Sequence, residues 1–309
     1  MAGPTRSSGY SDLSSTGTSK FIPQIWSGKI VEKFYKASVF GEIANTDYEG
    51  EVSGMGDKVI IRTVPDITVS DYQIGQSLSN QTPEKANVEL AIDQAKYFSV
   101  IVDDVDKAQS DLDLMGKFSD DASEQMKTKI DANVLTHVGA NVATANAGSS
   151  AGIISGNLGL GTAAAPLTIT KSTILDTILK AGQALDEQNV PETGRWIVLP
   201  AWAVAMIKGS DLKDASLSGD STSIMRNGRV GMIDRFTIYL SNNLNLVTGS
   251  NAHTQILAGH TSGITFASQI TNVETLKSES KFGTIVRGLN VFGRSVVKPE
   301  SLVLIRATS

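Results

Sequence analysis

The sequence predicts an α+β fold, because helical and strand-like patterns occupy separate stretches of its 309 residues. Apolar residues recur at helical spacing from Asp111 to about Ala145, whereas the stretch from Gly263 to Ala307 is typical of β-strands. Apolar residues make up 40% of the chain and charged residues 19%, close to the average for globular proteins. We therefore expect a folded chain with a sizeable core.

Composition excludes several classes of protein. The chain contains no run of about 18 apolar residues, so a transmembrane span is not expected. Residues 1–20 lack the apolar segment of a signal peptide. Cysteine is absent, which excludes disulfides and thiolate metal sites. The net charge of -5 argues against a dedicated nucleic-acid binder.

Charge is distributed unevenly along the chain. Residues 84–131 carry twelve acidic and six basic side chains, whereas residues 277–309 carry six basic and two acidic ones. Segments of opposite sign can pair within the fold or across subunits, and solvated faces are the alternative. Three of the basic residues that could face DNA phosphates are Lys277, Arg287 and Arg294. Salt bridges between subunits are the preferred interpretation of these residues.

The N-terminal region has two parts. Residues 1–20 are small and polar without periodicity, which predicts a flexible arm. Apolar residues then recur at three- and four-residue steps as far as Phe40, which predicts a short amphipathic helix beginning near Pro23. This helix either packs on its own domain or docks on a partner, and Trp26 and Phe34 are its interface candidates. Its apolar face consists of Ile22, Ile25, Trp26, Ile30, Val31, Phe34 and Tyr35.

A long hairpin follows the arm. Lys58–Val64 is rich in β-branched residues, and apolar and polar residues alternate around Leu90, which predicts two antiparallel strands. A polar loop of roughly twenty residues, Asp66–Lys85, joins them, and loops of that length are usually functional. Tyr97–Val102 then predicts a further strand. The loop tip is suited to a polar contact with a neighbour, with Tyr72, Gln76 and Asn80 as interface candidates.

The middle of the chain alternates helices and strands. The long helix from Asp111 would span ~50 Å, so it is expected to back a sheet or to connect domains. A Gly/Ala/Ser-rich stretch, Asn146–Pro166, ends it, and Thr170 or Ser172 can cap the next helix. The remaining predicted elements are a buried strand at 195–200, a helix at 201–208, a polar stretch at 209–231 and strands at 232–240 and 254–258.

One stretch of the sequence matches the pattern of a catalytic motif. Gly148-Ser-Ser-Ala-Gly152 matches the G-x-S-x-G nucleophile elbow, with Asp234 and His260 in the chain order of a Ser150 triad. The elbow requires a strand before the serine and a helix after it, whereas a helix precedes Ser150 here and a Gly/Ala loop follows. A linker of small residues is therefore the preferred interpretation, and a serine hydrolase using Ser150 is the alternative from a different class.

The remaining patterns do not predict a cofactor or metal site. Gly156–Gly161 is not a dinucleotide fingerprint, and the sequence contains no phosphate-binding P-loop. Asp103, Asp104 and Asp106 lack the spacing of a calcium loop. The histidines lack the spacing of a zinc protease helix. We expect no catalytic residue, no cofactor and no metal, so the chain is not expected to be an enzyme.

Four features nevertheless occur in a definite order. The arm and its short helix precede the hairpin, and Tyr97–Asp106 leads directly into the long helix. Leu185–Pro191 is followed by Arg195–Pro200, and a Val/Leu-rich strand ends the chain. In this order and spacing over nearly its whole length, the sequence resembles the major capsid protein of tailed double-stranded-DNA bacteriophages, a fold shared with encapsulin shells and the herpesvirus capsid floor.

The resemblance implies a division of the chain. The long helix would be the spine helix of the peripheral domain, and the hairpin loop would reach over an adjacent subunit. The implied segments are an N-terminal arm (1–45), an extension-loop hairpin (46–106), a peripheral domain with the spine helix (107–170), an axial domain (171–262) and a C-terminal β return to the peripheral domain (263–309).

The resemblance also implies a function. Family members form hexamers and pentamers that close into an icosahedral head around double-stranded DNA, which they contact nonspecifically. The expected location is therefore the virion capsid, assembled in the host bacterial cytoplasm, without a membrane partner. Because the arm that starts at Met1 is short, we expect a separate scaffolding protein, besides portal and decoration proteins. An encapsulin-type compartment shell is the structural alternative.

Overall fold

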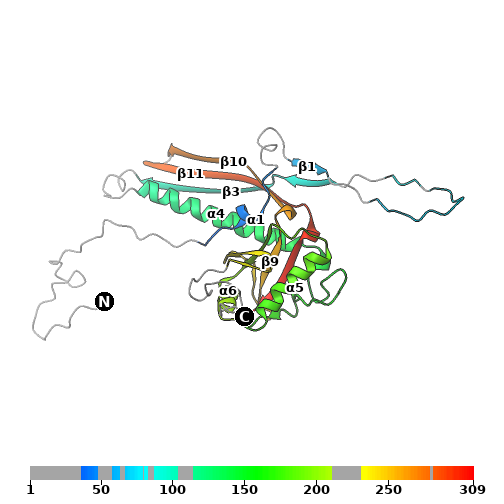
Figure 1. Cartoon of the computed structure of the whole chain (residues 1–309). Helices are drawn as coiled ribbons and strands as arrows, with labels where there is room; N and C mark the ends of the chain where they lie inside the picture. Colours follow the sequence, from blue (N-terminus) through cyan, green and yellow to red (C-terminus); the bar gives the residue numbers. More distant parts are fainter. Residues whose placement is uncertain are drawn as a thin grey trace, which may run out of the picture.

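The computed structural model describes residues 36–47, 58–62, 67–78, 80–82, 87–103, 114–210, 231–278 and 281–309. A long helix lies along one sheet, a second sheet with its own helices lies below, and a thin segment projects from one end (Figure 1). The predicted α+β class is confirmed. The predicted helix at 21–35, including Trp26 and Phe34, lies outside the described residues.

Helix α4 (Leu114–Ala140) lies along a three-stranded antiparallel sheet. The order of its strands is β10 (Ile264–Lys277), β11 (Gly283–Val296) and β3 (Gln94–Asp103), so β3 is an edge strand. The helix ends where the Asn141 side chain donates a hydrogen bond of 2.8 Å to the carbonyl of His137, which satisfies one of the last carbonyl groups. The predicted long helix is thus confirmed over these 27 residues.

The second sheet is mixed and has seven strands. Its strand order is β4 (Leu167–Thr168), β12 (Leu302–Thr308), β9 (His253–His260), β5 (Arg195–Leu199), β7 (Phe236–Leu240) and β6 (Met232–Ile233), while β8 (Leu246–Val247) pairs with β9. Strands β5 and β7 are parallel, as are β4 and β12, and the other pairs are antiparallel.

The central strand β5 is buried along its whole length because both faces of the sheet are covered. Ile197 and Leu199 pack on the side of helices α5 (Ile174–Glu187) and α6 (Ala201–Lys208). On the other face, Trp196 and Val198 belong to the same core cluster as four buried apolar residues of α4. Those residues are Ile130, Val134, Leu135 and Val138.

The buried Arg195 ties β5 to the loop after α5. Its guanidinium donates to the carbonyls of Val190 at 2.6 Å and Pro191 at 2.9 Å, and it pairs with Asp186 at 2.7 Å. Desolvation raises the pKa of Asp186, but hydrogen bonds from Arg195 and Arg235 outweigh it and lower that pKa. The two sequence features Leu185–Pro191 and Arg195–Pro200 are therefore joined by the contacts of one side chain, Arg195.

Two predicted strands differ in detail from the observed ones. The run from Met232 to Leu240 is divided by a two-residue turn, in which Asp234 and Arg235 have φ values of 45° and 65°. Such a turn matches the twist of the paired strands. The C-terminal β segment is also divided, since β10 pairs with β11 and β11 with β3, while β12 lies inside the seven-stranded sheet.

The predicted antiparallel hairpin is present in the described residues. Strands β1 (Lys58–Arg62) and β2 (Asn87–Ala91) pair in antiparallel fashion, with Lys58 opposite Ala91. A small core of Ile61, Leu90 and Ala267 fixes this hairpin to the start of β10. The segment between the two strands carries no described strand, and it projects away from the body of the molecule (Figure 1).

We expect Ile197→Ala to lower the free energy of unfolding by about 2–5 kcal/mol, because the truncation leaves a cavity between the sheet and α5. Urea denaturation of the unassembled subunit measures this change. Tyr72→Ala is the matched control, since that side chain is 65% exposed and its loss should change stability by less than about 0.5 kcal/mol. Equal effects of the two substitutions would contradict the core assignment.

Candidate assembly surfaces

The projecting segment, residues 67–82, is named the extension here. Its two limbs are bridged by Gln81, whose side chain accepts from the Thr68 N–H at 3.0 Å and donates to the Thr68 carbonyl at 2.7 Å. At the tip, the Gln76 side chain accepts from the Gln73 N–H at 3.1 Å, and Gly75 takes a φ of 86°. Glutamine side chains therefore shape the extension from within.

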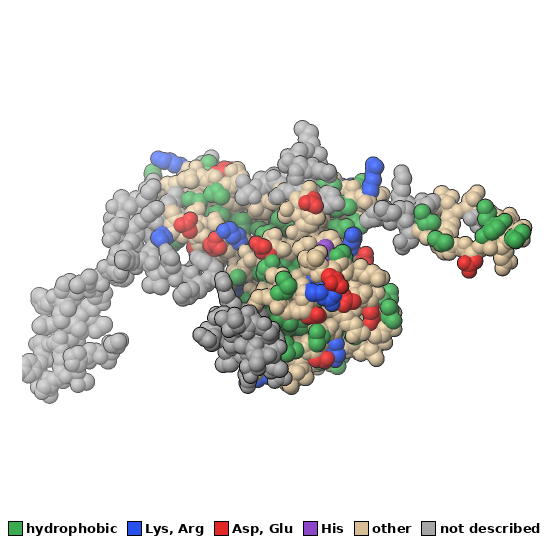
Figure 2. Space-filling view, in the orientation of Figure 1, with side chains coloured by type: hydrophobic (Ala, Val, Ile, Leu, Met, Phe, Trp, Pro, Cys, Tyr) green, Lys and Arg blue, Asp and Glu red, His purple; other side chains and the backbone are tan. Residues whose placement is uncertain are grey.

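Apolar side chains of the extension are exposed, although the sequence predicted a polar contact surface. Ile74 is fully exposed and Val69 is 93% exposed. Figure 2 shows hydrophobic side chains gathered on the segment that projects at the right. The candidates Tyr72, Gln76 and Asn80 are exposed on the same segment. Its large exposed apolar residues are Ile67, Val69, Tyr72, Ile74 and Leu78. Their irregular steps of two, three, two and four residues give no periodic signal, so sequence reasoning missed them.

A second apolar surface is the face of the three-stranded sheet that points away from α4. Tyr97 of β3 lies opposite Leu289 of β11, and Ile101 lies opposite Ile285 in the same pair of strands. Tyr97 is 80% exposed, and Ile101 and Leu289 are also exposed. Sheet faces of this kind are normally covered by another element or another subunit.

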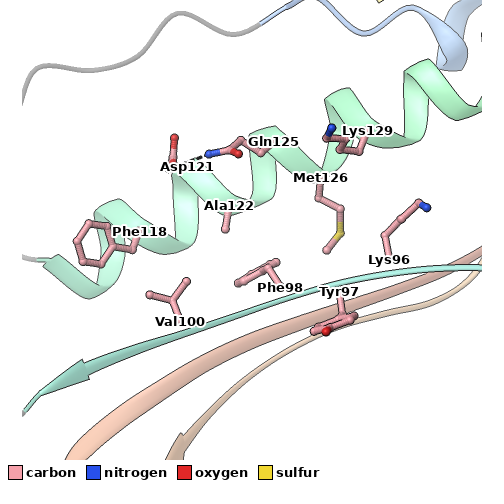
Figure 3. A pocket seen from close by; sticks show the side chains of 10 residues that line it. All are labelled: Lys96, Tyr97, Phe98, Val100, Phe118, Asp121, Ala122, Gln125, Met126 and Lys129. Atoms are coloured by element: carbon pink, nitrogen blue, oxygen red, sulfur yellow. Dashed lines mark hydrogen bonds between the residues drawn. The ribbon is translucent and has the colours of Figure 1, made fainter.

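Between α4 and β3 lies a groove of about 430 Å³, named the α4–β3 groove. Figure 3 shows Phe98 and Val100 pointing from β3 toward the helix, and Phe118 and Met126 pointing from the helix toward the strand. Phe118 remains exposed. Lys96, Asp121 and Lys129 lie at its rim. The groove is thus an apolar slot with charged edges.

The buried carboxylate of Asp131 fixes the point where the arm meets the body. It accepts from the backbone N–H groups of Val39 and Phe40, both at 2.9 Å. It also accepts from the Asn243 side chain at 2.6 Å. Helix α1 (Phe40–Ile43) follows directly. Since a buried charge requires such partners, Asp131 holds three separate segments together.

The three predicted DNA-facing residues do not share one surface. Arg287 and Arg294 are seven residues apart on β11, so their side chains point to opposite faces of the sheet. Arg287 pairs with Glu274 at 2.9 Å on the exposed face. Burial lowers the pKa of Arg294, with Asp93 acting in the opposite sense, and its side chain is half-buried. Lys277 is exposed at the end of β10, and DNA contact by any of the three stays a prediction.

The hydrolase alternative finds no support in the geometry around Ser150. The exposed Ser150 follows a 3-10 turn (Thr144–Asn146), and no helix begins between it and α5. The Nδ1 atom of His260 accepts from the Ser262 N–H at 3.1 Å. In the described part of the chain, no hydrogen bond joins Ser150 to His260. No group of three His, Asp or Glu side chains there could hold a metal ion, and none of its helices has the length and hydrophobicity for a membrane span.

The glycine-rich loop after α4 is instead organised by Glu187. This carboxylate accepts from the N–H groups of Ile154 at 2.8 Å and Ser155 at 3.1 Å. Desolvation raises the pKa of Glu187, but these hydrogen bonds outweigh it and hold the pKa at about 2. Gly152 turns the chain with a φ of 98°. The loop therefore presents the exposed Ile153 and Ile154 on a fixed backbone.

Comparison with known protein families identifies the class. Residues 87–305 match the family described as phage capsid protein. The match covers more than half of the chain, so the chain belongs to the phage capsid protein family. It is accordingly a structural capsid protein, and the match favours neither a compartment shell nor a hydrolase. No curated protein sequence matches the chain.

Solved structures support the same fold. A structure of Mycobacterium phage Che8 is 28% identical, with a TM-score of 0.75, and the alignment covers 92% of this chain and 97% of that one. The capsid of cyanophage P-SCSP1u is 18% identical, with a TM-score of 0.69 and full coverage of both chains. The capsid of a native GTA particle is 13% identical, with a TM-score of 0.64 and coverage of 97% and 99%. The expected phage major-capsid-protein fold is confirmed.

We expect Glu187→Gln to be less stable than the unmodified chain at pH 7, because the amide cannot provide the charged acceptor for Ile154 and Ser155. The folded-state pKa is depressed to about 2 from 4.5, so this stabilisation is complete above about pH 4.5. It is lost as the pH falls toward about 2, and the two stabilities should converge. Urea denaturation between pH 7 and pH 3 measures the difference. A difference that stays constant with pH would contradict the assignment, and Glu300→Gln, at an exposed site, is the control.

Proposed function

We propose that the chain is the major capsid protein of a tailed double-stranded-DNA phage, and that it self-assembles as hexamers and pentamers into an icosahedral head. The observation that supports this most directly is the extension. It exposes Val69, Ile74 and other apolar side chains without contributing to any core. Such a surface is unfavourable in an isolated subunit and becomes favourable when a neighbour covers it.

Exposed apolar surfaces of this kind are favourable in a lattice of identical subunits. Each subunit of a closed shell meets several neighbours, so weak contacts repeated around the subunit add up to a stable assembly. The extension, the exposed face of the three-stranded sheet and the Ile153–Ile154 loop lie on different parts of the subunit. A subunit with several such surfaces can bind several copies of itself at once.

The segments carry different roles in this proposal. Residues 1–45 would be the arm, 46–106 the extension-loop hairpin and 107–170 the peripheral domain around α4. Residues 171–262 would form the axial domain, nearest the centre of each hexamer or pentamer. Residues 263–309 would return to the peripheral domain through β10 and β11, which form one sheet with β3, while β12 belongs to the sheet of the axial region.

The proposed partners are copies of the chain itself, separate scaffolding, portal and decoration proteins, and packaged DNA held by nonspecific contact. The protein would be located in the virion and would assemble in the host bacterial cytoplasm. Family membership supports the capsid location.

We expect electron microscopy of the purified full-length chain, produced with and without neighbouring viral genes, to show closed shells or rings of five and six subunits. Closed shells containing nuclease-protected DNA are expected when the packaging proteins are present. A monodisperse monomer or dimer under both conditions would overturn the proposal.

We expect the substitution of Ile74 and Leu78 by serine to leave a folded subunit that assembles poorly, because both side chains are exposed. Burying one such side chain contributes about 1.5–3 kcal/mol, so each contact should weaken by about tenfold or more. Circular dichroism checks the fold and sedimentation measures the assembled fraction.

Two further variants complete this test. Deletion of residues 71–81 should give the same result as the double substitution. Ser70→Ala and Ser77→Ala alter exposed polar positions of the same segment and should assemble normally. Unimpaired shells from the deletion would remove the extension from the interface.

A further inference from the structure

A hollow of about 410 Å³ lies at one end of the seven-stranded sheet, and it is named the α6 pocket here. Its walls come from the first turn of α6, the segment around β8 and the end of β12. Leu246 is 62% exposed there, and Trp202 is half-buried. Pockets that bind ligands typically measure ~300–1,000 Å³, so this one has room for apolar side chains of another chain. The apolar residues that line it are Pro200, Trp202, Leu244, Leu246, Ala252 and Ala307.

The Ile153–Ile154 loop is an apolar projection of fixed shape. Ile153 is 60% exposed and Ile154 is 81% exposed. Beneath them, Ala151 and Leu158 are buried in the core, and the Leu158 N–H donates to the Ala151 carbonyl at 3.0 Å. The carboxylate of Glu187 holds the loop from the other side through the N–H of Ile154. A loop that is already ordered loses little conformational entropy on binding, so its two isoleucines are suited to insertion into a pocket.

The loop and the pocket lie at opposite ends of α5. The loop is bound to Glu187, the last residue of that helix. At the other end, β4 precedes α5 and pairs with Ala307 and Thr308 of β12, which line the pocket. Figure 1 shows the C-terminus beside this end of α5. The 14 residues of α5 span ~21 Å, so a loop fixed at one end of the helix cannot enter the pocket of its own chain.

The two ends of α5 also differ in charge. Four carboxylates and two guanidinium groups lie around the end that holds the loop, an excess of two negative charges. At the pocket end, Lys171 is exposed three residues before α5 begins, whereas Asp176 is paired with Lys180 at 2.8 Å. The acidic end of one copy therefore complements the basic end of another, which favours a head-to-tail contact between copies. The charged residues at the loop end are Asp186, Glu187, Glu192, Asp234, Arg195 and Arg235.

We infer that the Ile153–Ile154 loop of one copy of the chain inserts into the α6 pocket of the next copy. This inference rests on the proposed self-assembly and specifies one of its contacts. Because the loop and the pocket are different surfaces, the contact is heterologous, and each copy can bind one neighbour at each end of α5. Such a contact continues from copy to copy until a ring closes, as rings of five and six subunits require.

The absence of cysteine permits an unambiguous crosslinking test. In the full-length Ile154→Cys/Leu246→Cys variant, each copy carries one thiol in the loop and one at the pocket. A short thiol-specific crosslinker should join the assembled copies into a ladder that extends to five and six subunits, because the contact is head-to-tail. Leu179→Cys/Leu246→Cys is the matched control, since Leu179 is 53% exposed in the middle of α5. We expect the first variant to give at least about tenfold more ladder than the control.

A second measurement does not depend on shell formation. Sedimentation velocity over a series of concentrations measures the self-association of the full-length chain, and circular dichroism checks that each variant is folded. We expect Ile154→Ser and Leu246→Ser each to weaken self-association by about tenfold or more, whereas Leu179→Ser leaves it unchanged. Ile154→Ser/Leu246→Ser should weaken it little further, because both substitutions remove the same contact. Fully additive losses would contradict the pairing of the loop with the pocket.

The outcomes separate the two proposals. Shells whose subunits give no ladder above the control would overturn the contact between loop and pocket and leave the capsid function standing. A crosslinked product that stops at dimers would show a symmetric contact, and crosslinking within single copies of the dilute variant would show that each loop enters its own pocket. Either result also overturns the inference. If no shells form, the capsid proposal fails, and the self-association measurement alone decides on the contact.

Discussion

One helix packs on two sheets, and the rest of the structure depends on that arrangement. The C-terminal half of α4 packs against the seven-stranded sheet through Val134, Leu135 and Val138, while its N-terminal half lies along β3. Its buried Asp131 additionally binds the chain just before α1 and the residues after β7. Because these contacts lie on a single rigid element, the two sheets and the arm exit have a fixed geometry.

This arrangement separates a well-packed body from surfaces that are incompletely covered. Strand β5 has both faces buried, whereas the extension has neither. The exposed face of the three-stranded sheet and the α4–β3 groove are intermediate cases, each apolar and open on one side. The remaining apolar surface of such a subunit is suited to burial against other chains.

The elements predicted best from the sequence are those whose buried residues form a continuous apolar run or a helical period over a short stretch of chain. The continuous apolar run at residues 195–200 and the periodicity of α4 and α5 both correspond to observed elements. The order of these local runs also carried the capsid resemblance. The turn at Asp234 and Arg235 was missed because it lacks the glycine that normally marks such a turn.

Long-range partners and exposed apolar groups were not predictable in the same way. The position of β12 depends on pairing with β4 and β9, which lie far away in sequence. Sequence reasoning concentrated on the polar residues of the extension and overlooked Val69 and Ile74, because apolar residues at irregular steps inside a polar loop give no periodic signal. The α4–β3 groove depends on the spatial distance between a strand and a helix, which no local pattern encodes.

The position of β12 has a consequence for the timing of folding during synthesis. The last seven-residue strand, Leu302–Thr308, is inserted between β4 and β9, and Leu302–Leu304 are almost fully buried. The seven-stranded sheet therefore cannot close until β12 has been synthesised and has left the ribosome. Pairing between such distant segments also slows folding, because the chain loses the entropy of closing a long loop before the stabilising contacts between the strands form. A nascent chain thus lacks a completed seven-stranded sheet until β12 is available to pair with β4 and β9.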